Sequence, residues 1–405
     1  MNKTMMALSC VLALSNAPAA MAACGIRNEV PVAVLSAGFQ AWKSVTAAMA
    51  ECGNVKAELD QEFSAKEPAA FAANPALYQI GGVANETMVP LANAGTIRPL
   101  ESLVAKYGQG LSPNQLIKIN GKVMAIAMDV NAQHFMYRAD IFEKLGIAEP
   151  KTYADVLAAA AKIKAANAAP YPIGATMKVG GNVATDFVNM FGAQGGALFG
   201  ASGKPTVNGP AGVQALETMR ALTAYMDPEY LNSDSTYVQK QFQQGKIAMA
   251  NLWGSRAGAL EDPKESTVAG KIGLSAAPAA MAGGKPASAI WWDGMVIAKN
   301  ITEAQADAAF QVMLQGFNTD MVQAHNDDVV WLVNGYKPGR LARGVIETLQ
   351  GGAPPYPSSA RMGLLVTALG NQLPDYFTGK VTAVQALTNV ENRYDVAAKE
   401  AGLLK

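Results

Sequence analysis

The chain has 405 residues, which is long enough for two lobes that each bury a core of their own. Its 32 lysine and arginine residues balance 32 aspartate and glutamate residues. A nucleic-acid groove needs a clustered basic excess, so this balance argues against nucleic acid as a partner.

The first 22 residues have the features of a secretory signal peptide. Lys3 precedes an apolar run over residues 5–14, and small residues follow at Ala20 and Ala22. The run is too short for a membrane helix, which needs roughly 20 apolar residues, and no later segment reaches that length. The sequence therefore predicts a cleaved signal and a soluble periplasmic protein.

Cleavage would remove Cys10 and leave Cys24 and Cys52, an even pair in an oxidising compartment. Cys24 precedes the first expected strand, and Cys52 follows a helix that runs back to the starting edge of that strand. We therefore predict a structural disulfide between them. In the competing interpretation Cys24 is a lipidated N-terminus, although Met21 fits a lipoprotein signal poorly.

Strand-like and helical segments alternate along the chain, which predicts parallel sheets covered by helices on both faces. Thr152 is expected to cap one helix, and Pro210 suits the first turn of the next. Thr302 and Gln305 form a capping box for a further helix. Near the end, an apolar stripe predicts one more buried helix face; it contains Met362, Leu365, Leu369 and Leu373.

A hairpin and its exit are the most informative segment. Residues 116–119 and 123–128 flank Asn120-Gly121, the pair that supplies the two positive-φ positions of a two-residue turn. Asp129 and Asn131 are then expected just past a strand end, where open α/β sheets place ligands.

The sequence after this hairpin resembles a known family. Residues 136–147 (MYRADIFEKLGI) and 150–157 (PKTYADVL) are similar to a run found in the family 1 extracellular solute-binding proteins of ABC sugar importers, which are related to maltose-binding protein. Further similar elements span nearly all of the mature chain; they lie at residues 32–42, 94–100, 242–249 and 378–387.

This resemblance implies an α/β, two-lobe periplasmic binding protein fold of class II, with a mixed sheet flanked by helices in each lobe and a ligand cleft between the lobes. Lobe 1 would contain residues 23–130 and about 294–320, and lobe 2 residues 131–293 and about 321–405. The resemblance also implies a monomer without cofactors that closes on a sugar, oligosaccharide or sugar alcohol and delivers it to the membrane permease.

Catalytic templates are absent from the sequence. There is no Gly-x-Ser-x-Gly nucleophile elbow, and His134 and His325, the only histidines, lie too far apart to suggest a metal site. A carboxylate pair could still serve a glycosidase. Two alternatives therefore stay open: a secreted carbohydrate-active enzyme, and a binding protein for an amino acid or peptide. The second would require an unpaired arginine or aspartate facing the site.

Aromatic rings that stack on sugar C–H faces are the first candidates for ligand contacts. Trp253 follows a strand directly and is expected to reach the cleft. Neighbouring residues of a strand face opposite ways, so only one of Trp291 and Trp292 is expected to face the ligand unless the backbone kinks. Trp292 is favoured together with Asp293, and Trp291 is then core or a second wall. Trp42, on the first helix, is a further candidate, whereas Trp331 is expected to be buried.

Polar side chains that bind hydroxyl groups complete the expected site. Asp129 and Asn131 are the strongest candidates, with a hinge hydrogen bond or cap as the alternative role. Gln79 follows an apparent second strand, and Arg361 opens the late amphipathic helix. His134 is expected to be structural.

Overall fold

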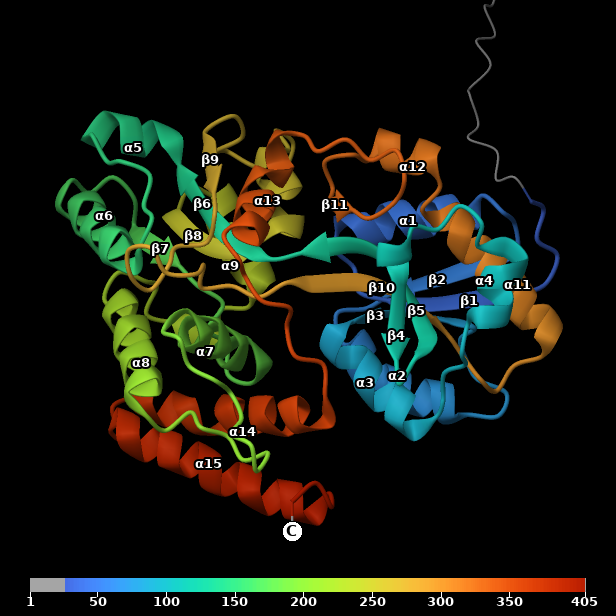
Figure 1. Ribbon diagram of the computed structural model, residues 1–405. Coiled ribbons are helices and arrows are strands. Elements are labelled where there is room, and N and C mark those ends of the chain that lie inside the picture. The colour runs from blue at the N-terminus through green and yellow to red at the C-terminus, as the bar shows by residue number, and fades with distance from the viewer. Residues whose placement is uncertain (1–25, 405) are drawn as a thin grey trace, which may run out of the picture.

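The computed structural model describes residues 26–404, in which the chain forms two lobes, each built on one β-sheet flanked by helices (Figure 1). The signal peptide expected at residues 1–22 and the candidate disulfide residue Cys24 lie outside the described residues. No helix among residues 26–404 is both long and apolar enough to cross a membrane.

Lobe 1 is built on a seven-stranded sheet with the order β11-β5-β10-β3-β1-β2, to which β4 adds by pairing with β5. β1 pairs in parallel with β2 and β3, whereas β10 runs antiparallel to both β3 and β5, so the sheet is mixed rather than parallel throughout. Its elements are β1 (Val32–Ser36), α1 (Gln40–Ala50), β2 (Val55–Leu59), α2 (Phe63–Ala72), β3 (Ile80–Ala84), α3 (Asn85–Ala94), α4 (Glu101–Tyr107), β4 (Leu116–Ile119), β5 (Lys122–Asn131), β10 (Trp291–Ile297), α11 (Glu303–Gly316), α12 (Thr319–Ala324) and β11 (Val330–Trp331).

Lobe 2 is built on a four-stranded sheet with the order β7-β8-β6-β9, in which only the β7–β8 pair is parallel. Its elements are β6 (Gln133–Arg138), α5 (Ala139–Leu145), α6 (Tyr153–Ala165), β7 (Tyr171–Gly174), α7 (Gly181–Ala193), α8 (Pro210–Thr223), α9 (Ser235–Gln243), β8 (Ile247–Trp253), α10 (Ala257–Glu261), β9 (Ile272–Ser275), α13 (Arg343–Gln350), α14 (Ala360–Phe377) and α15 (Ala383–Glu400). Short 3₁₀ turns lie at Pro113–Gln115 in lobe 1 and at Tyr230–Asn232, Gly254–Arg256 and Arg340–Ala342 in lobe 2.

The chain passes between the lobes along neighbouring strands. β5 of lobe 1 continues after Ala132 into β6 of lobe 2, and the chain returns from β9 into β10, which pairs with β5. Lobe 1 also extends beyond the limit expected near residue 320, because β11 pairs with β5 and Trp331 is buried in the lobe 1 core.

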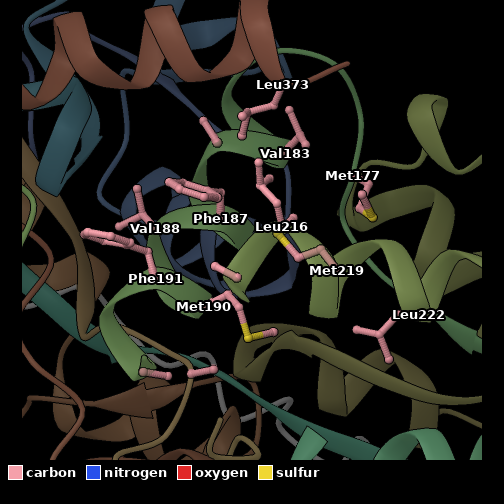
Figure 2. Packing of buried hydrophobic residues seen from close by; sticks show 14 of the residues in the cluster. Met177, Val183, Phe187, Val188, Met190, Phe191, Leu216, Met219, Leu222 and Leu373 are labelled. Carbon is pink, nitrogen blue, oxygen red and sulfur yellow. The ribbon is translucent and has the colours of Figure 1, made fainter. Parts of the chain in front are cut away.

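Each sheet carries apolar packing on both faces. In lobe 1, one cluster lies under α1, α4, α11 and α12, and another lies under α2 and α3. The largest cluster fills lobe 2, where residues of α7 and α8 converge with Leu373 of α14 (Figure 2). The stripe expected at residues 362–373 is buried as predicted. The apolar clusters of lobe 1 and lobe 2 are separate, so each lobe has its own core.

Local signals in the sequence are confirmed where they depend on neighbouring residues alone. Asn120 and Gly121 adopt positive φ values of 49° and 78° between β4 and β5. Thr152 caps α6 through the backbone N–H of Asp155, and Thr302 caps α11 through that of Gln305. β5 differs from expectation, because it extends through Asp129 to Asn131 where pairing with β10 and β11 prolongs it.

Candidate ligand-binding site

A pocket of about 140 Å³ lies where the two lobes meet. Phe39 contributes from the start of α1 in lobe 1, and Asp293 contributes from the crossing strand β10. The remaining lining residues are Asn131, Ser235, Trp253, Ser255, Arg256 and Trp291. The pocket thus joins an apolar wall to a set of hydrogen-bonding groups.

Residues of both lobes also line two larger hollows. One, of about 520 Å³, shares Ser235 with the pocket and is bordered by Gln61 and Glu62 of lobe 1 and by polar residues of α9. The other, of about 540 Å³, lies between α3 and α14 and is lined by Glu86 and Tyr356. A hollow of about 690 Å³ is larger but is lined by lobe 2 and the Pro354–Pro357 region only, so movement of lobe 1 would not enclose it.

Three aromatic rings form one wall. The Trp253 and Trp291 rings meet edge to face, with centroids 5.3 Å apart and planes at 84°. Trp291 also lies against Tyr356, with centroids 3.9 Å apart and planes at 32°. Trp291 and Tyr356 are buried, whereas Trp253 is only partly buried. Trp253 therefore presents aromatic surface to the pocket and is held in place by rings behind it.

Hydrogen bonds fix the amide that faces this wall. Asn131 Nδ2 donates to Ser255 Oγ (3.2 Å), and the Ser255 backbone N–H donates to Asn131 Oδ1 (3.4 Å). Asn131 ends β5 and Ser255 follows β8, so the pair links the crossing strand to lobe 2. Both side chains are thereby positioned beside Asp293.

Two carboxyl groups lie side by side under the pocket. Asp129 and Asp293 are partners in the β5–β10 pair, and the Asp293 N–H donates to Asp129 Oδ1 (3.0 Å). Burial raises the pKa of Asp129 well above its ordinary value, and the neighbouring Asp293 raises it further. Burial also raises the pKa of Asp293, to about 7, against the lowering effects of Asn131 and Arg256. Burial therefore favours the protonated form of both carboxyl groups, and the pKa of Asp293 lies near neutral pH.

Arg256 supplies the positive charge of the pocket. Its Nη1 donates to Gln239 Oε1 (3.2 Å) and its Nη2 donates to Ser235 Oγ (3.0 Å), both on α9. Burial lowers the pKa of the guanidinium, while the charges of Asp234 and Asp293 oppose that change. An arginine remains charged at neutral pH in spite of such burial.

Of the residues expected from the sequence, Asn131, Trp253 and Asp293 line the pocket, and three others lie elsewhere. Trp42 is buried in lobe 1, one helical turn beyond Phe39, with its ring against Gly82. Gln79 is buried and extends the sheet, because its backbone and side chain bond to Ala33. Arg361 is exposed beside Gly203 and donates to the Leu403 carbonyl (3.3 Å).

Two further expectations are corrected by the strands. Trp291 rather than Trp292 shares the pocket face with Asp293, because alternate residues of a strand point the same way, and Trp292 packs toward the α2–α3 side of lobe 1. Asp129 is fully buried behind Asp293 and does not line the pocket. Trp331 is buried as expected, and His134 is buried against Gly344.

Four pocket residues were not expected from the sequence: Phe39, Ser235, Ser255 and Arg256. Phe39 directly precedes the helix that carries Trp42, and it lines the pocket where Trp42 was expected to do so. Ser255 and Arg256 follow Trp253 within three positions, and this closeness in sequence is the signal that points to them. Ser235 comes from a helix whose approach to the pocket has no local signal.

A serine, a histidine and an aspartate meet in lobe 1, yet their geometry does not fit a catalytic relay. Ser44 Oγ donates to Asp328 Oδ2 (2.6 Å) and lies 3.1 Å from His325 Nδ1. Asp328 Oδ2 approaches the same ring nitrogen at 3.4 Å. A relay needs the hydroxyl and the carboxylate on opposite ring nitrogens. Among residues 26–404, no group of three or more histidine, cysteine, aspartate and glutamate side chains could hold a metal ion.

The chain shares sequence with two proteins of ABC transport systems. A probable ABC transporter-binding protein of Deinococcus radiodurans is 33% identical over 185 residues, which is 42% of each chain. A probable amino-acid ABC transporter periplasmic-binding protein of Sinorhizobium fredii is 27% identical over 169 residues. The match covers 38% of that relative, so the chain spans less than half the length of the curated relatives that it matches.

The fold is similar to that of solved solute-binding proteins. An ABC transporter solute-binding protein of Agrobacterium radiobacter K84, in complex with ribitol, has a TM-score of 0.79 at 21% identity over 91% of this chain and 99% of that one. Maltose-bound MalE3 of T. maritima has a TM-score of 0.77 at 19% identity, over 91% and 99%. The two-lobe, mixed-sheet α/β fold expected from the sequence is thus confirmed. The model of the bacterial extracellular solute-binding protein family matches residues 35–315, more than half of the chain, and the protein therefore belongs to this family.

Proposed function

We propose that this protein is the solute-binding component of an ABC import system, and that it captures a sugar, an oligosaccharide or a sugar alcohol. The observation that carries the proposal is the pocket between the lobes, where Trp253 offers an aromatic face beside Asn131 and Asp293. A sugar presents C–H faces to a ring and hydroxyl groups to amides and carboxyls, so this combination suits it. The sugar and polyol complexes among similar folds support the same class of solute.

Binding would work by closure of the lobes. Phe39 lies in lobe 1 and Trp253 in lobe 2, so a solute contacts both only when they approach each other. The solute then stabilises the closed form by the difference between its contacts in the two states. The membrane permease of the importer is the proposed partner that recognises this closed form, and the receptor itself would act as a monomer.

The proposed location is the periplasm, reached through the signal peptide at residues 1–22. A disulfide between Cys24 and Cys52 belongs to this proposal. Its support is that the backbone N–H of Asn28 donates to the Cys52 carbonyl (2.7 Å), which holds the segment after Cys24 beside Cys52. Thiol titration of unreduced, denatured periplasmic protein should find essentially no free thiol. Two reactive thiols, or a lipid on Cys24, would contradict the disulfide.

A thermal-shift screen against sugars, sugar alcohols, oligosaccharides and amino acids tests the proposed function. A solute present at 100 times its dissociation constant should stabilise the folded protein by about 2.7 kcal/mol. Stabilisation by a carbohydrate or polyol is the expected result. Stabilisation by amino acids alone would overturn the proposal in favour of an amino-acid receptor.

Recovery of the bound solute separates binding from catalysis. The protein is incubated with its tightest solute, and the solute is then examined by mass spectrometry. An unchanged solute is expected from a transport receptor. A cleaved or modified solute would identify a carbohydrate-active enzyme instead.

A further inference from the structure

Arg256 is a largely buried cation whose two hydrogen-bond partners in the protein, Gln239 and Ser235, are both neutral. The hydrogen bonds to Gln239 and Ser235 account for two of its five N–H donors, and Nε has no acceptor among residues 26–404. The same part of the chain contains no ion pair between Arg256 and a carboxylate. The guanidinium nevertheless borders the pocket beside Ser255 and Asp293.

The two carboxyl groups whose charges act on Arg256 are engaged elsewhere. Asp234 caps α9 by accepting the backbone N–H of Tyr237 (2.9 Å) and pairs with Lys178 (3.3 Å). Asp293 interacts with Asn131 and lies against Asp129. Neither carboxylate approaches Arg256 closely enough to form an ion pair, so the positive charge is left available to a ligand.

A largely buried guanidinium without a hydrogen-bonded counter-ion is costly, because it loses water and gains only the more distant charges of Asp234 and Asp293. A carboxylate is the acceptor that matches it best, since its two oxygens fit two parallel N–H groups. The pocket of about 140 Å³ is small, and pockets for drug-sized ligands measure roughly 300 to 1,000 Å³. A single sugar unit carrying one carboxylate agrees with both the charge and the size.

We propose that the solute is a sugar acid, an aldonate or a uronate, whose carboxylate is bound by Arg256 while its hydroxyl-bearing carbons lie against Trp253. This inference rests on the proposed function, because it names the class of carbohydrate taken by the same pocket. Asn131 and Ser235 then serve the hydroxyl groups. Asp293 serves them too, on the side of the pocket formed by the crossing strand.

Calorimetric titration of the unmodified protein with matched solutes tests the inference. Each pair shares its hydroxyl pattern and differs in the carboxylate: D-gluconate with D-glucitol, D-galacturonate with D-galactose, and D-glucuronate with D-glucose. The acid of at least one pair should bind about tenfold tighter or more than its neutral partner. Neutral members that bind as tightly as the acids would overturn the inference and leave the proposed function intact. A panel in which amino acids bind and no carbohydrate does would overturn both.

Variants then assign the preference to Arg256. Arg256→Gln keeps an amide near Ser235 but removes the charge, so it should lose roughly tenfold or more in affinity for the acid and far less for the neutral partner. Arg256→Lys keeps the charge and should keep the preference for the acid at reduced affinity. Equal losses for acid and neutral solutes in Arg256→Gln would show that the guanidinium contributes shape rather than charge.

The matched control is Arg361→Gln. Arg361 is exposed beside Gly203 and does not line the pocket, so this variant should bind both members of each pair like the unmodified protein. Circular dichroism of all three variants checks that each is folded. The comparison of acid with neutral solutes in the unmodified protein decides the inference even if a variant of Arg256 does not fold.

Discussion

Asp293 and Asp129 are chemically identical neighbours with different access to the ligand pocket. Asp293 lines the pocket, whereas Asp129 is fully buried behind it and accepts its backbone N–H. Asp129 can therefore affect a solute only through Asp293, by holding it in place and by a hydrogen bond that lowers the pKa of Asp293. A direct hydrogen bond from solute to Asp129, which the sequence suggested, does not fit this geometry.

Trp253→Ala should weaken binding of the solute found in the screen by roughly 1 to 3 kcal/mol, because it removes the partly exposed ring of the aromatic wall. Calorimetric titration measures the change, and the melting temperature of the free protein should show that the fold persists. Trp292→Phe is the control, since Trp292 packs on the other side of β10 and does not line the pocket. Normal affinity in Trp253→Ala would mean that the ring only packs the loop.

The sequence indicated which residues lie near strand ends more reliably than it indicated which side chains point into the pocket. Asn131, Trp253 and Asp293 follow or occupy strand ends at the crossover, a position that pattern alone could identify. Trp42 does not line the pocket, because it lies one helical turn further along α1 and faces the core, and Phe39 lines the pocket instead. Arg361 lies in the first turn of α14, on a part of lobe 2 away from the pocket. The position of α14 relative to the pocket depends on tertiary packing, which the local sequence does not reveal.

Strand β10 shows why the pairing of elements cannot be predicted from single residues. The register of β5 and β10 shifts between Asp293 and Gly294, so a bulge lies directly under the pocket. A Cβ on Gly294 would lie 2.4 Å from the Ile126 carbonyl oxygen, and glycine therefore permits the close approach of the two strands. The caps and the Asn120-Gly121 turn needed only local chemistry, whereas this bulge and the pairing of β11 with β5 depend on segments far apart in sequence.

Helix α13 packs so closely on β6 that it requires a glycine. A Cβ on Gly344 would lie 2.0 Å from Nδ1 of the buried His134. Gly344→Ala should therefore destabilise the protein by about 1 to 2 kcal/mol, because overpacking costs more than the gain in helix propensity. The midpoint of urea unfolding measures this change.

Gly363→Ala in α14 is the matched control for that substitution. Gly363 is exposed, and a Cβ there would meet no atom within 4 Å. The same chemical change should therefore stabilise the protein, by about 0.5 to 1 kcal/mol. Stabilisation by both substitutions would show that α13 can move away from His134 without cost.

The stability of the whole molecule should depend on a carboxyl group far from the pocket. Glu67 of α2 is buried against Gly81 of β3 in lobe 1. Burial raises its pKa to about 9, so the folded protein holds this proton at neutral pH while the unfolded chain releases it. The stability that this group contributes is complete below its unfolded pKa, about 4.3, and is lost as the pH rises toward 9.

Glu67→Gln removes this titration and keeps the shape of the side chain. Its free energy of unfolding should rise relative to that of the unmodified protein by up to about 1.4 kcal/mol for each pH unit between pH 5 and pH 9. Denaturant unfolding across this pH range measures the difference. Glu400→Gln makes the same chemical change at an exposed position of α15 and is the matched control. A difference independent of pH for Glu67→Gln would mean that Glu67 is ionised in the folded protein.

The central place of β10 in lobe 1 also has a consequence for biosynthesis. β3 and β5 are synthesised early, but the strand that lies between them begins only at Trp291, after most of lobe 2 has left the ribosome. The first lobe therefore cannot complete its sheet on the nascent chain, and its pairing depends on contacts between distant segments, which form slowly. Slow completion of lobe 1 agrees with the proposed export of this protein, in which the chain would cross a membrane before it folds.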